Sequence, residues 1–385
     1  MEKNLKVALV HDWLVNYGGA EDVVSAILEI YPDADIYTLV HDKKKMKGRF
    51  EKNKIFTSRL QKIPFATRLY TKFLKFMPAA FEAFDFSAYD LVICSSSSCA
   101  KGVITPPQTA QVAYVHTPMR YAWDLFFDYQ KRSGALTRFF MDRWMPQIRL
   151  WDYVSAQRID ALFANSKYIA RRIKKFWNRD ALVIYPPVNV GYFNPTNGAV
   201  GAEREDFYVF FSRLVPYKRA DIAIDACAAL GKKLVVIGGG SEAKNLQELA
   251  KGKSGITFTG RISDEKVREY LQKCKALIFC AEEDFGIIPV QAQACGTPVI
   301  AFGKGGATES VLDKKTGVFF PEQTAASCAE AIKEFEKLEA AGNFDAKKIV
   351  AHAKTFSRER FIKEFKAACQ DALAAVNGRP KSERR

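Results

Sequence analysis

The chain contains 385 residues, of which 48% are hydrophobic and 26% are charged, and its formal net charge is +15. A chain of this length exceeds one hydrophobic core and predicts two domains of roughly 180 residues each, while its apolar content excludes a wholly disordered protein. It has no run of 18 apolar residues and no charged-then-apolar start, so we expect neither a membrane-spanning helix nor export. The eight cysteines form no Cys-x-x-Cys pair, which is typical of small buried side chains in a reducing cytoplasm.

Apolar runs that end in polar or glycine-rich loops recur through the first half of the chain. The first is a strand over residues 6–10, which leads through a loop containing Gly18 and Gly19 into a helix over residues 20–30. A second helix is predicted at 169–176, and further strands are predicted at 36–40, 91–94, 112–115, 160–166 and 182–185. This alternation indicates a Rossmann-like fold. The glycine loop does not match Gly-x-Gly-x-x-Gly, which disfavours dinucleotide binding.

One short motif has the form of a metal site. Asp33-Ala34-Asp35 resembles an Asp-x-Asp metal motif, but it lies between a predicted helix and a predicted strand, and we interpret it as a turn. No other cluster of His, Cys or carboxylate side chains has metal-ligand spacing. We therefore expect no metal.

Positive charge is concentrated in residues 43–75, where twelve Lys or Arg residues accompany a single acidic residue, Glu51. Apolar residues at helical spacing lie between basic ones over residues 69–76. Such a surface is typical of proteins that rest on anionic lipid, where each basic residue contributes ~1 kcal/mol. A solvated charged face is the alternative, and no recognised module indicates nucleic-acid binding. We predict a cytoplasmic protein held at the inner face of the plasma membrane through residues 43–77.

His116 follows directly after the strand predicted over residues 112–115. Open α/β sheets bind ligands at the carboxyl ends of their strands, so His116 is a candidate site residue. A histidine with a purely structural role is the alternative. Residues 124–160, which follow, are aromatic and basic and are predicted to be helical.

Residues 186–198 lack any periodicity and contain three prolines, so we predict an interdomain linker that can act as a hinge. The second half then repeats the alternation of the first. Its predicted strands are 207–211, 233–237, 257–262, 276–280, 298–302 and 319–320, and its predicted helices are 220–230, 265–274, 290–295, 325–338, 346–354 and 356–368. Asp264 is the predicted N-cap of the helix over residues 265–274.

Arg213 and Lys218 bracket the loop after the first strand of the second half. Two fixed cations at the carboxyl end of a strand suit a diphosphate, with up to ~4 kcal/mol for each close charge pair at an effective dielectric near 20. A solvated basic loop is the alternative. Gly238 and Gly239 follow the next strand and are predicted to let the base or ribose of a nucleotide approach the backbone.

Residues 282–298 are the most informative stretch, because an acidic loop and a helix there follow the strand predicted over residues 276–280. Gly286 lets the backbone approach a ligand, and the free N–H groups near residues 286–288 form an anion site at the helix start. Glu283 stands directly before that site. A carboxylate beside a phosphate site indicates a ligand that also presents hydroxyl groups, and a nucleotide sugar has both features.

This stretch also resembles a known family. Glu283-Asp284-Phe285-Gly286, followed by Pro289, Ala292 and Gly296-Thr297-Pro298-Val299-Ile300, is similar to the donor-site signature of the family-four retaining glycosyltransferases. In that family seven residues lie between two glutamates, and here Glu283 has the first position while Gln291 has the second. The family's second glutamate holds ribose hydroxyls, from which a glutamine amide oxygen can also accept. Arg213 and Lys218 match the family's phosphate pair.

The resemblance covers almost the whole chain and is most specific over residues 207–310. It implies an α/β protein of the GT-B fold, in which two Rossmann-like domains face each other across a cleft and a C-terminal helix returns to the N-terminal domain. We accordingly predict four parts, which are an acceptor-binding domain (1–187), a nucleotide-sugar-binding domain (188–355), the returning helix (356–376) and a disordered tail (377–385).

The resemblance also implies roles for the site residues. The catalytic set is His116, which contacts the transferred sugar, Glu283, which orients it, and Arg213 and Lys218, which stabilise the leaving diphosphate. Donor-binding residues are those of the glycine loops and the helix start, together with Arg261 beside the base: Gly18, Gly19, Gly238, Gly239, Arg261, Phe285, Gly286, Ile287 and Gln291. The implied reaction is glycosyl transfer with retention, and it requires no metal and no cofactor apart from the nucleotide-sugar donor.

The donor is predicted from the motifs around residues 116–121, 282–286 and 303–306, which are most similar to bacterial mannosyltransferases of surface-polysaccharide assembly. They imply GDP-mannose as donor and a glycan, in our prediction lipid-linked, as acceptor. A UDP-hexose or UDP-N-acetylhexosamine stays open, because no residue excludes uracil. Two other classes also stay open, namely a nucleotide-sugar epimerase and a binding protein without transfer activity.

Overall fold

The structure is a computed structural model that describes residues 5–131, 133–195 and 204–378. The chain divides into two units. The first unit comprises the residues up to Tyr185 and those from Phe361 onward, and the second comprises Pro186–Arg360. Part of the predicted linker (196–198) and most of the predicted disordered tail (379–385) lie outside the described residues.

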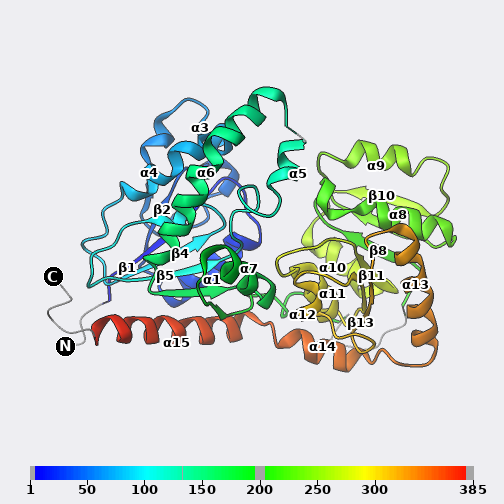
Figure 1. Cartoon of the computed structure of the whole chain (residues 1–385). Coiled ribbons are helices and arrows are strands. Elements are labelled where there is room, and N and C mark those ends of the chain that lie inside the picture. The colour runs from blue at the N-terminus through cyan, green and yellow to red at the C-terminus, as the bar shows by residue number, and fades with distance from the viewer. Residues whose placement is uncertain (1–4, 132, 196–203, 379–385) are drawn as a thin grey trace. The chain divides into compact units, whose positions relative to one another are not determined.

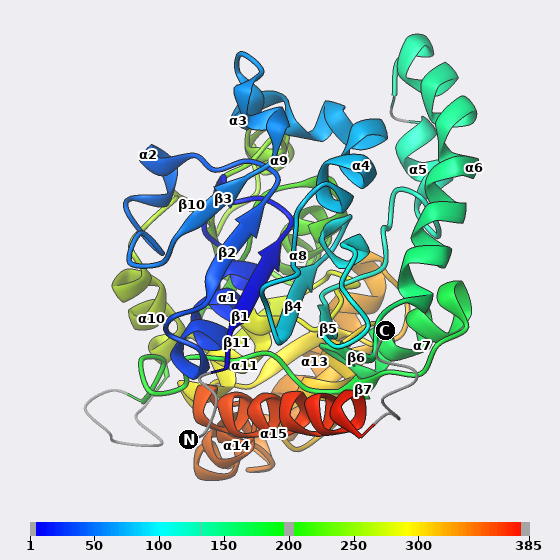
Figure 2. The ribbon, with the colours of Figure 1, turned by 90° about the vertical axis from the view of Figure 1, so that its left-hand side faces the viewer.

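The first unit is built on a parallel sheet of seven strands in the order β3-β2-β1-β4-β5-β6-β7 (Figure 2). Its strands are short, and those inside the sheet are almost wholly buried, as expected for a parallel sheet with helices on both faces, whereas the edge strands β3 and β7 are partly exposed. They are β1 (Val7–His11), β2 (Asp35–Thr38), β3 (Ile55–Thr57), β4 (Leu91–Ser96), β5 (Ala110–Val115), β6 (Ala161–Ala164) and β7 (Leu182–Val183). The chain order reverses between β1 and β4, which defines the topological switch point of this sheet.

The helices of the first unit cover this sheet and extend beyond it. They are α1 (Gly19–Ile30), α2 (Lys43–Met46), α3 (Ala66–Leu69), α4 (Met77–Glu82), α5 (Phe126–Lys131), α6 (Ala135–Gln157), α7 (Lys167–Trp177) and α15 (Arg358–Asn377), with the 3₁₀ helices η1 (Arg59–Lys62), η2 (Tyr70–Phe76) and η3 (Ala100–Gly102).

Helix α15 follows the whole second unit in the chain yet belongs to the core of the first (Figures 1 and 2). Phe361 and Phe365 are fully buried and stack on each other at 5.3 Å between ring centroids. Both rings also meet Tyr114 of β5 edge to face, at 5.6 and 6.1 Å. This packing agrees with the helix that the family resemblance implied.

The second unit is built on a parallel sheet of six strands in the order β10-β9-β8-β11-β12-β13. Its strands are β8 (Tyr208–Phe211), β9 (Leu234–Ile237), β10 (Ile256–Gly260), β11 (Ala276–Phe279), β12 (Val299–Phe302) and β13 (Gly317–Phe320). Its helices are α8 (Ala220–Ala229), α9 (Ala243–Leu249), α10 (Asp264–Lys273), α11 (Ile287–Ala294), α12 (Ala307–Ser310), α13 (Ala325–Ala340) and α14 (Ala346–Lys354), with the 3₁₀ helix η5 (Pro216–Lys218). The switch point lies between β8 and β11.

The predicted α/β fold with two Rossmann-like domains is therefore confirmed. Several elements were not predicted, among them the edge strand β3 and the helices α2, α3, α4 and α9. The predicted N-cap of α10 was wrong by one residue, because Ser263 is the cap and its hydroxyl accepts the Lys266 N–H at 3.3 Å. Asp264 is the first residue of the helix, where its charge favours the positive end of the helix dipole.

The apolar face predicted over residues 69–76 has a different role from the one expected. Tyr70, Phe73 and Leu74 of η2 pack against the core of the first unit, so they are not available to lipid. Other apolar side chains of this basic segment are exposed instead, among them Phe65 and Phe76 at 69% and 57%. Within the described residues, no helix combines the length and apolar content needed to cross a bilayer.

Candidate functional site

A buried ion pair lies at the switch point of the second sheet. Lys218 comes from the loop after β8, and its ammonium group contacts the Glu283 carboxylate from the loop after the neighbouring strand β11. The side chains of Lys218 and Glu283 are only 9% and 19% exposed. Ligands of open α/β sheets bind outside the carboxyl ends of the strands at such a switch point. Two residues predicted to act together are thus in direct contact, although 65 residues separate them in the chain.

Arg213 and Lys218 belong to the same loop but differ in their surroundings. Arg213 is exposed, and its guanidinium donates to the Tyr217 hydroxyl at 3.3 Å. Lys218 is buried at the end of η5, because the next residue, Arg219, has a left-handed conformation (φ 54°) that turns the chain into α8. The loop therefore presents one fixed cation and one exposed cation, which suits a ligand with two phosphate groups.

The Glu283 loop packs against a glycine loop, residues 303–306, that follows β12. The Gly306 N–H donates to the Glu283 carbonyl at 2.8 Å. A Cβ on Gly306 would lie 2.3 Å from Cα of Phe285, and one on Gly305 would lie 2.5 Å from the Glu283 carbonyl oxygen. Both contacts are shorter than a side chain allows. No sequence motif indicates this supporting role of the loop.

The helix that follows Glu283 begins as predicted with Gly286 before its first turn. Gly286 has φ 85°, a conformation that glycine adopts without strain, and it is the N-cap of α11. No side chain caps the helix. The amide groups of the first turn, at Ile287 and Ile288, carry the partial positive charge of a helix N-terminus. Lys218, Arg213 and this helix start supply positive charge, while Glu283 supplies the acceptor.

The two other donor-site residues in this region lie as follows. Phe285 is buried, and its ring packs 5.5 Å from the ring of Phe356, so only its backbone can meet a ligand. Gln291 is half-buried on α11, and its side chain makes no hydrogen bond to any residue in the described part of the chain. The Gln291 amide therefore has free capacity for a ligand.

Two of the predicted nucleotide-binding glycines, Gly238 and Gly239, follow the carboxyl end of β9. A Cβ on Gly238 would lie 1.9 Å from the Ser212 carbonyl oxygen, so this glycine serves the close approach of the chain's own backbone. Gly239 faces the exposed Arg261, since its Cβ would lie 3.2 Å from the Arg261 side chain. The Gly238 N–H donates to the Gly260 carbonyl at 2.9 Å, which ties the two loops together.

His116, Gly18 and Gly19 belong to the first unit. The Nε2 atom of His116 lies 2.8 Å from the Ser95 hydroxyl at the end of β4. Burial, with a smaller contribution from the charge of His11, lowers the pKa of His116 to about 3, so its imidazole is neutral at physiological pH. Gly18 precedes α1 and Gly19 is its first residue, and the Gly18 N–H donates to the Glu21 carboxylate at 2.8 Å.

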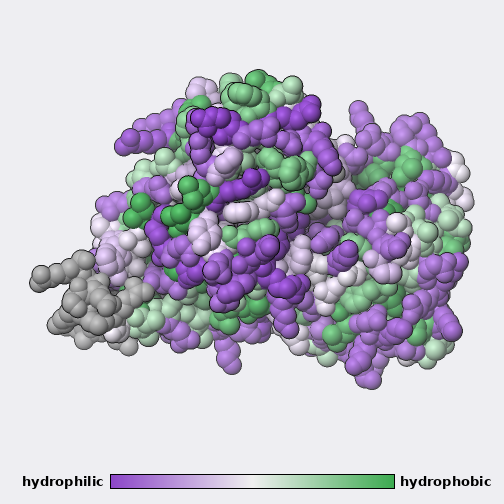
Figure 3. Space-filling view, in the orientation of Figure 1, coloured by the Kyte–Doolittle hydropathy of each residue, from purple (hydrophilic) through white to green (hydrophobic). Residues whose placement is uncertain are grey.

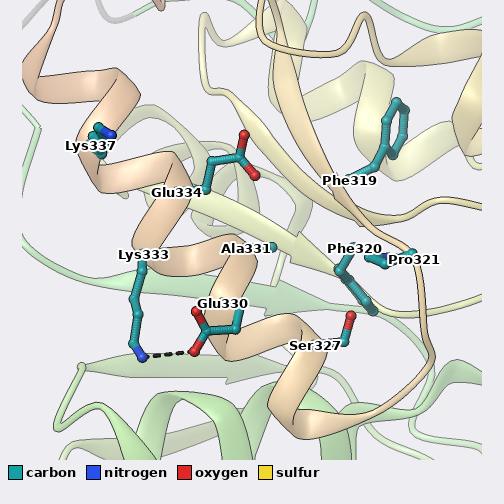
Figure 4. A pocket seen from close by; sticks show the side chains of 9 residues that line it. All are labelled: Phe319, Phe320, Pro321, Ser327, Glu330, Ala331, Lys333, Glu334 and Lys337. Carbon is teal, nitrogen blue, oxygen red and sulfur yellow. Dashed lines mark hydrogen bonds and ion pairs between the residues drawn. The ribbon is translucent and has the colours of Figure 1, made fainter.

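A groove of about 600 Å³ lies between the end of β13 and α13 in the second unit (Figure 4). Its charged residues alternate in sign along α13, and Lys333 pairs with Glu330 at 2.8 Å. None of the predicted site residues lines this groove. It lacks the converging cations of the switch point, and we do not assign it a role.

The structure matches solved glycosyltransferases of the GT-B class over nearly its whole length. HepE of Anabaena, solved in complex with UDP, is 19% identical with a TM-score of 0.71, and the match covers 95% of this chain and 100% of HepE. Sucrose-phosphate synthase of Thermosynechococcus elongatus is 18% identical with a TM-score of 0.72, covering 97% of this chain and 100% of that enzyme. These likenesses establish the fold.

A match to a family model comes from the sequence of the second unit. Residues 198–355 match the family model of the glycosyl transferases group 1. D-inositol 3-phosphate glycosyltransferase of Mycobacteroides abscessus is 28% identical over 236 residues, which are 56% of this chain and 53% of that protein. An uncharacterized glycosyltransferase of Methanocaldococcus jannaschii is 30% identical over 178 residues, 46% of this chain and 49% of that protein. The match spans about half the length of these curated relatives.

Proposed function

We propose that the protein is a retaining glycosyltransferase that transfers a hexose from a nucleoside-diphosphate sugar to a hydroxyl group of a glycan. The observation that carries this proposal is the Lys218–Glu283 pair at the switch point, with Arg213 on the same loop and the open start of α11 beside it. A diphosphate needs cations and amide donors, and a hexose needs a hydrogen-bond acceptor. The second unit has all of these on neighbouring strand ends.

The structure supports a mechanism in which charge on the departing diphosphate is stabilised. As the glycosidic bond to the phosphate breaks, negative charge develops on the phosphate oxygens, where Arg213, Lys218 and the α11 amides lower its energy. The acceptor hydroxyl attacks from the side of the leaving group and passes its proton to the departing phosphate, which retains the anomeric configuration. Glu283 and His116 orient the sugar, and neither acts as a nucleophile.

The donor is proposed to be GDP-mannose, on the motif resemblance of residues 116–121, 282–286 and 303–306. A UDP-hexose is the second candidate, and it has separate support, because HepE, which shares the fold, was solved with UDP and with UDP-glucose.

The acceptor is proposed to be lipid-linked, and the protein to bind the anionic membrane surface where that lipid lies. The supporting surface is larger than the segment predicted from the sequence. On α6, Leu136 and Phe139 are 70% and 64% exposed, and apolar side chains gather over the outer end of this helix (Figure 3). The Lys75 ammonium lies 4.8 Å from the Trp144 ring, which joins α6 to the basic segment that carries Phe65. Exposed aromatic residues among lysines suit an anionic bilayer.

Two experiments test these proposals. Incubation with radiolabelled GDP-mannose, UDP-glucose or UDP-N-acetylglucosamine and a lipid extract should put label into the lipid fraction for one donor. Binding without transfer would favour a binding protein, and interconversion of the free nucleotide sugar would favour an epimerase.

In vesicle sedimentation, the double variant Phe65→Ser/Phe139→Ser should bind phosphatidylglycerol vesicles about tenfold more weakly. Leu312→Ser, an exposed control in the second unit, should bind them as the wild type does. Equal binding by both variants would contradict the membrane surface.

A further inference from the structure

A continuous chain of buried hydrogen bonds runs through the first unit and ends at His116. The Glu21 carboxylate lies 3.3 Å from Nε2 of His11, and Nδ1 of His11 lies 3.1 Å from the Ser95 hydroxyl. That hydroxyl in turn lies 2.8 Å from Nε2 of His116. Glu21, His11 and Ser95 are all buried, on α1, β1 and β4 respectively, so the chain crosses the switch point of the first sheet.

The two ends of this chain are residues for which the sequence predicted a ligand role. At one end, the second carboxylate oxygen of Glu21 accepts the Gly18 N–H at 2.8 Å, which fixes the glycine loop. At the other end is His116, whose backbone carbonyl also accepts from the Asn165 side chain at 2.9 Å. The sequence analysis assigned no role to Glu21, His11 or Ser95.

The partners of His11 decide the direction of the chain. Its Nε2 faces the Glu21 carboxylate, and its Nδ1 lies 3.2 Å from the Ser95 backbone carbonyl as well as near the Ser95 hydroxyl. The Ser95 carbonyl is an acceptor only, so Nδ1 of His11 is suited to carry a proton. The Ser95 hydroxyl then receives a hydrogen bond from His11 and directs its own proton toward Nε2 of His116.

This direction fixes what His116 can offer to a ligand. A neutral imidazole carries one proton, and its second nitrogen sets the position of that proton through the hydrogen bond it makes. If Nε2 of His116 accepts from Ser95, the proton is on Nδ1, and the ring presents an N–H donor. We propose that Glu21, His11 and Ser95 are positioning residues that hold His116 in its Nδ1–H tautomer, so that it donates to an oxygen of the transferred sugar. The ligand part of this statement depends on the proposed function, whereas the tautomer does not.

The tautomer can be read directly, because the chain has only four histidines. In the full-length protein labelled with ¹⁵N-histidine, two-bond ¹H–¹⁵N spectra distinguish an imidazole protonated at Nδ1 from one protonated at Nε2. His116 is assigned by the loss of its signals in His116→Gln. We expect the Nδ1–H form in the wild type and also in Glu21→Gln, whose amide can donate to Nε2 of His11 and leaves the proton on Nδ1, and a shift toward Nε2–H in Ser95→Ala, which removes the hydroxyl that donates to His116. A wild-type His116 protonated at Nε2, or a tautomer that Ser95→Ala leaves unchanged, would overturn the proposal.

Transfer kinetics separate this inference from the proposed function. Ser95→Ala should lower kcat about tenfold with little change in the KM of the donor, and it should have no further effect in the His116→Gln background. Glu29→Gln, an exposed position on α1, is the control and should leave both the tautomer and kcat unchanged. If the tautomer responds as expected but no donor supports transfer, the hydrogen-bond chain stands and the glycosyltransferase proposal fails. If transfer is normal and the tautomer does not respond, the glycosyltransferase proposal stands and the role of the hydrogen-bond chain fails.

Discussion

Replacement of Lys218 by methionine tests the central ion pair most directly, because it removes the charge and keeps the aliphatic stem. The free protein and the donor complex should respond differently. In the free protein, Lys218→Met leaves the Glu283 carboxylate without its partner. Breaking a fully buried pair costs about 3–5 kcal/mol, and since the Glu283 side chain is 19% exposed we expect about 2 kcal/mol. That loss lowers the Tm of the second unit by about 4–8 °C.

In the donor complex, Lys218→Met removes a charged hydrogen bond to the diphosphate. Such bonds contribute about 1.5–3 kcal/mol, which corresponds to a Kd for GDP or UDP that is about 10- to 160-fold higher. Glu283→Gln should act in the opposite sense on the free nucleoside diphosphate, because it releases Lys218 from its competing partner. The same substitution should weaken binding of the complete nucleotide sugar, since the hexose loses its acceptor.

Isothermal titration calorimetry and differential scanning fluorimetry measure the two effects on the same samples. Lys233→Met is a matched control, since Lys233 is an exposed lysine just before β9 in the same unit. Arg213→Gln should raise the Kd without lowering the Tm, because Arg213 is exposed and donates to a tyrosine hydroxyl rather than to a carboxylate. If Lys218→Met lowered the Tm but changed the Kd of the nucleoside diphosphate less than threefold, the lysine would be a structural residue and the phosphate role would be refuted.

Three further predictions concern other parts of the site. Gln291→Glu should tighten nucleotide-sugar binding about threefold in a titration, and weaker binding would show that the glutamine is itself adapted to the donor. Gly306→Ala should cost about 1–3 kcal/mol and weaken donor binding, because its Cβ meets Phe285 at 2.3 Å; Gly134→Ala, which meets nothing within 4 Å, is the thermal-melt control. His116 has a lowered pKa and therefore binds fewer protons folded than unfolded, so stability should fall as the pH decreases from 6.5 toward 3, by up to ~1.4 kcal/mol per pH unit. Urea titrations should show a flatter profile for His116→Gln, and an unchanged slope would contradict the assignment.

The sheets were predictable because parallel strands buried on both faces are continuous apolar runs, such as residues 276–279. The strand β3 was missed for the converse reason, since Ile55–Thr57 is a partly exposed edge strand of three residues among lysines. Contacts between loops could not be predicted from the sequence. The support of the Glu283 loop by Gly306 depends on strands β11 and β12 lying side by side, which no local pattern encodes.

The site residues of the second unit were predictable because they stand directly after apolar strands, where ligands bind. The same rule would have identified His11, which ends the buried strand β1, and with it the start of the chain to His116. His11 was not predicted as a site residue because no motif accompanies it. Glu21 has no such local signal, since an acidic residue in the first turn of a helix is usual, and only its burial marks it.

The position of α15 has a consequence for synthesis of the protein. The side chains that complete the first hydrophobic core, Phe361 and Phe365 among them, are translated only after all of the strands of both sheets. During translation the part of the first sheet that α15 covers therefore stays exposed, although α1 already packs on the same core, while the second unit, continuous in sequence, can already fold. Newly made chains should thus depend on chaperones for the earlier-made half, and a ribosome stalled before residue 361 should display a protease-sensitive first unit beside a protected second one.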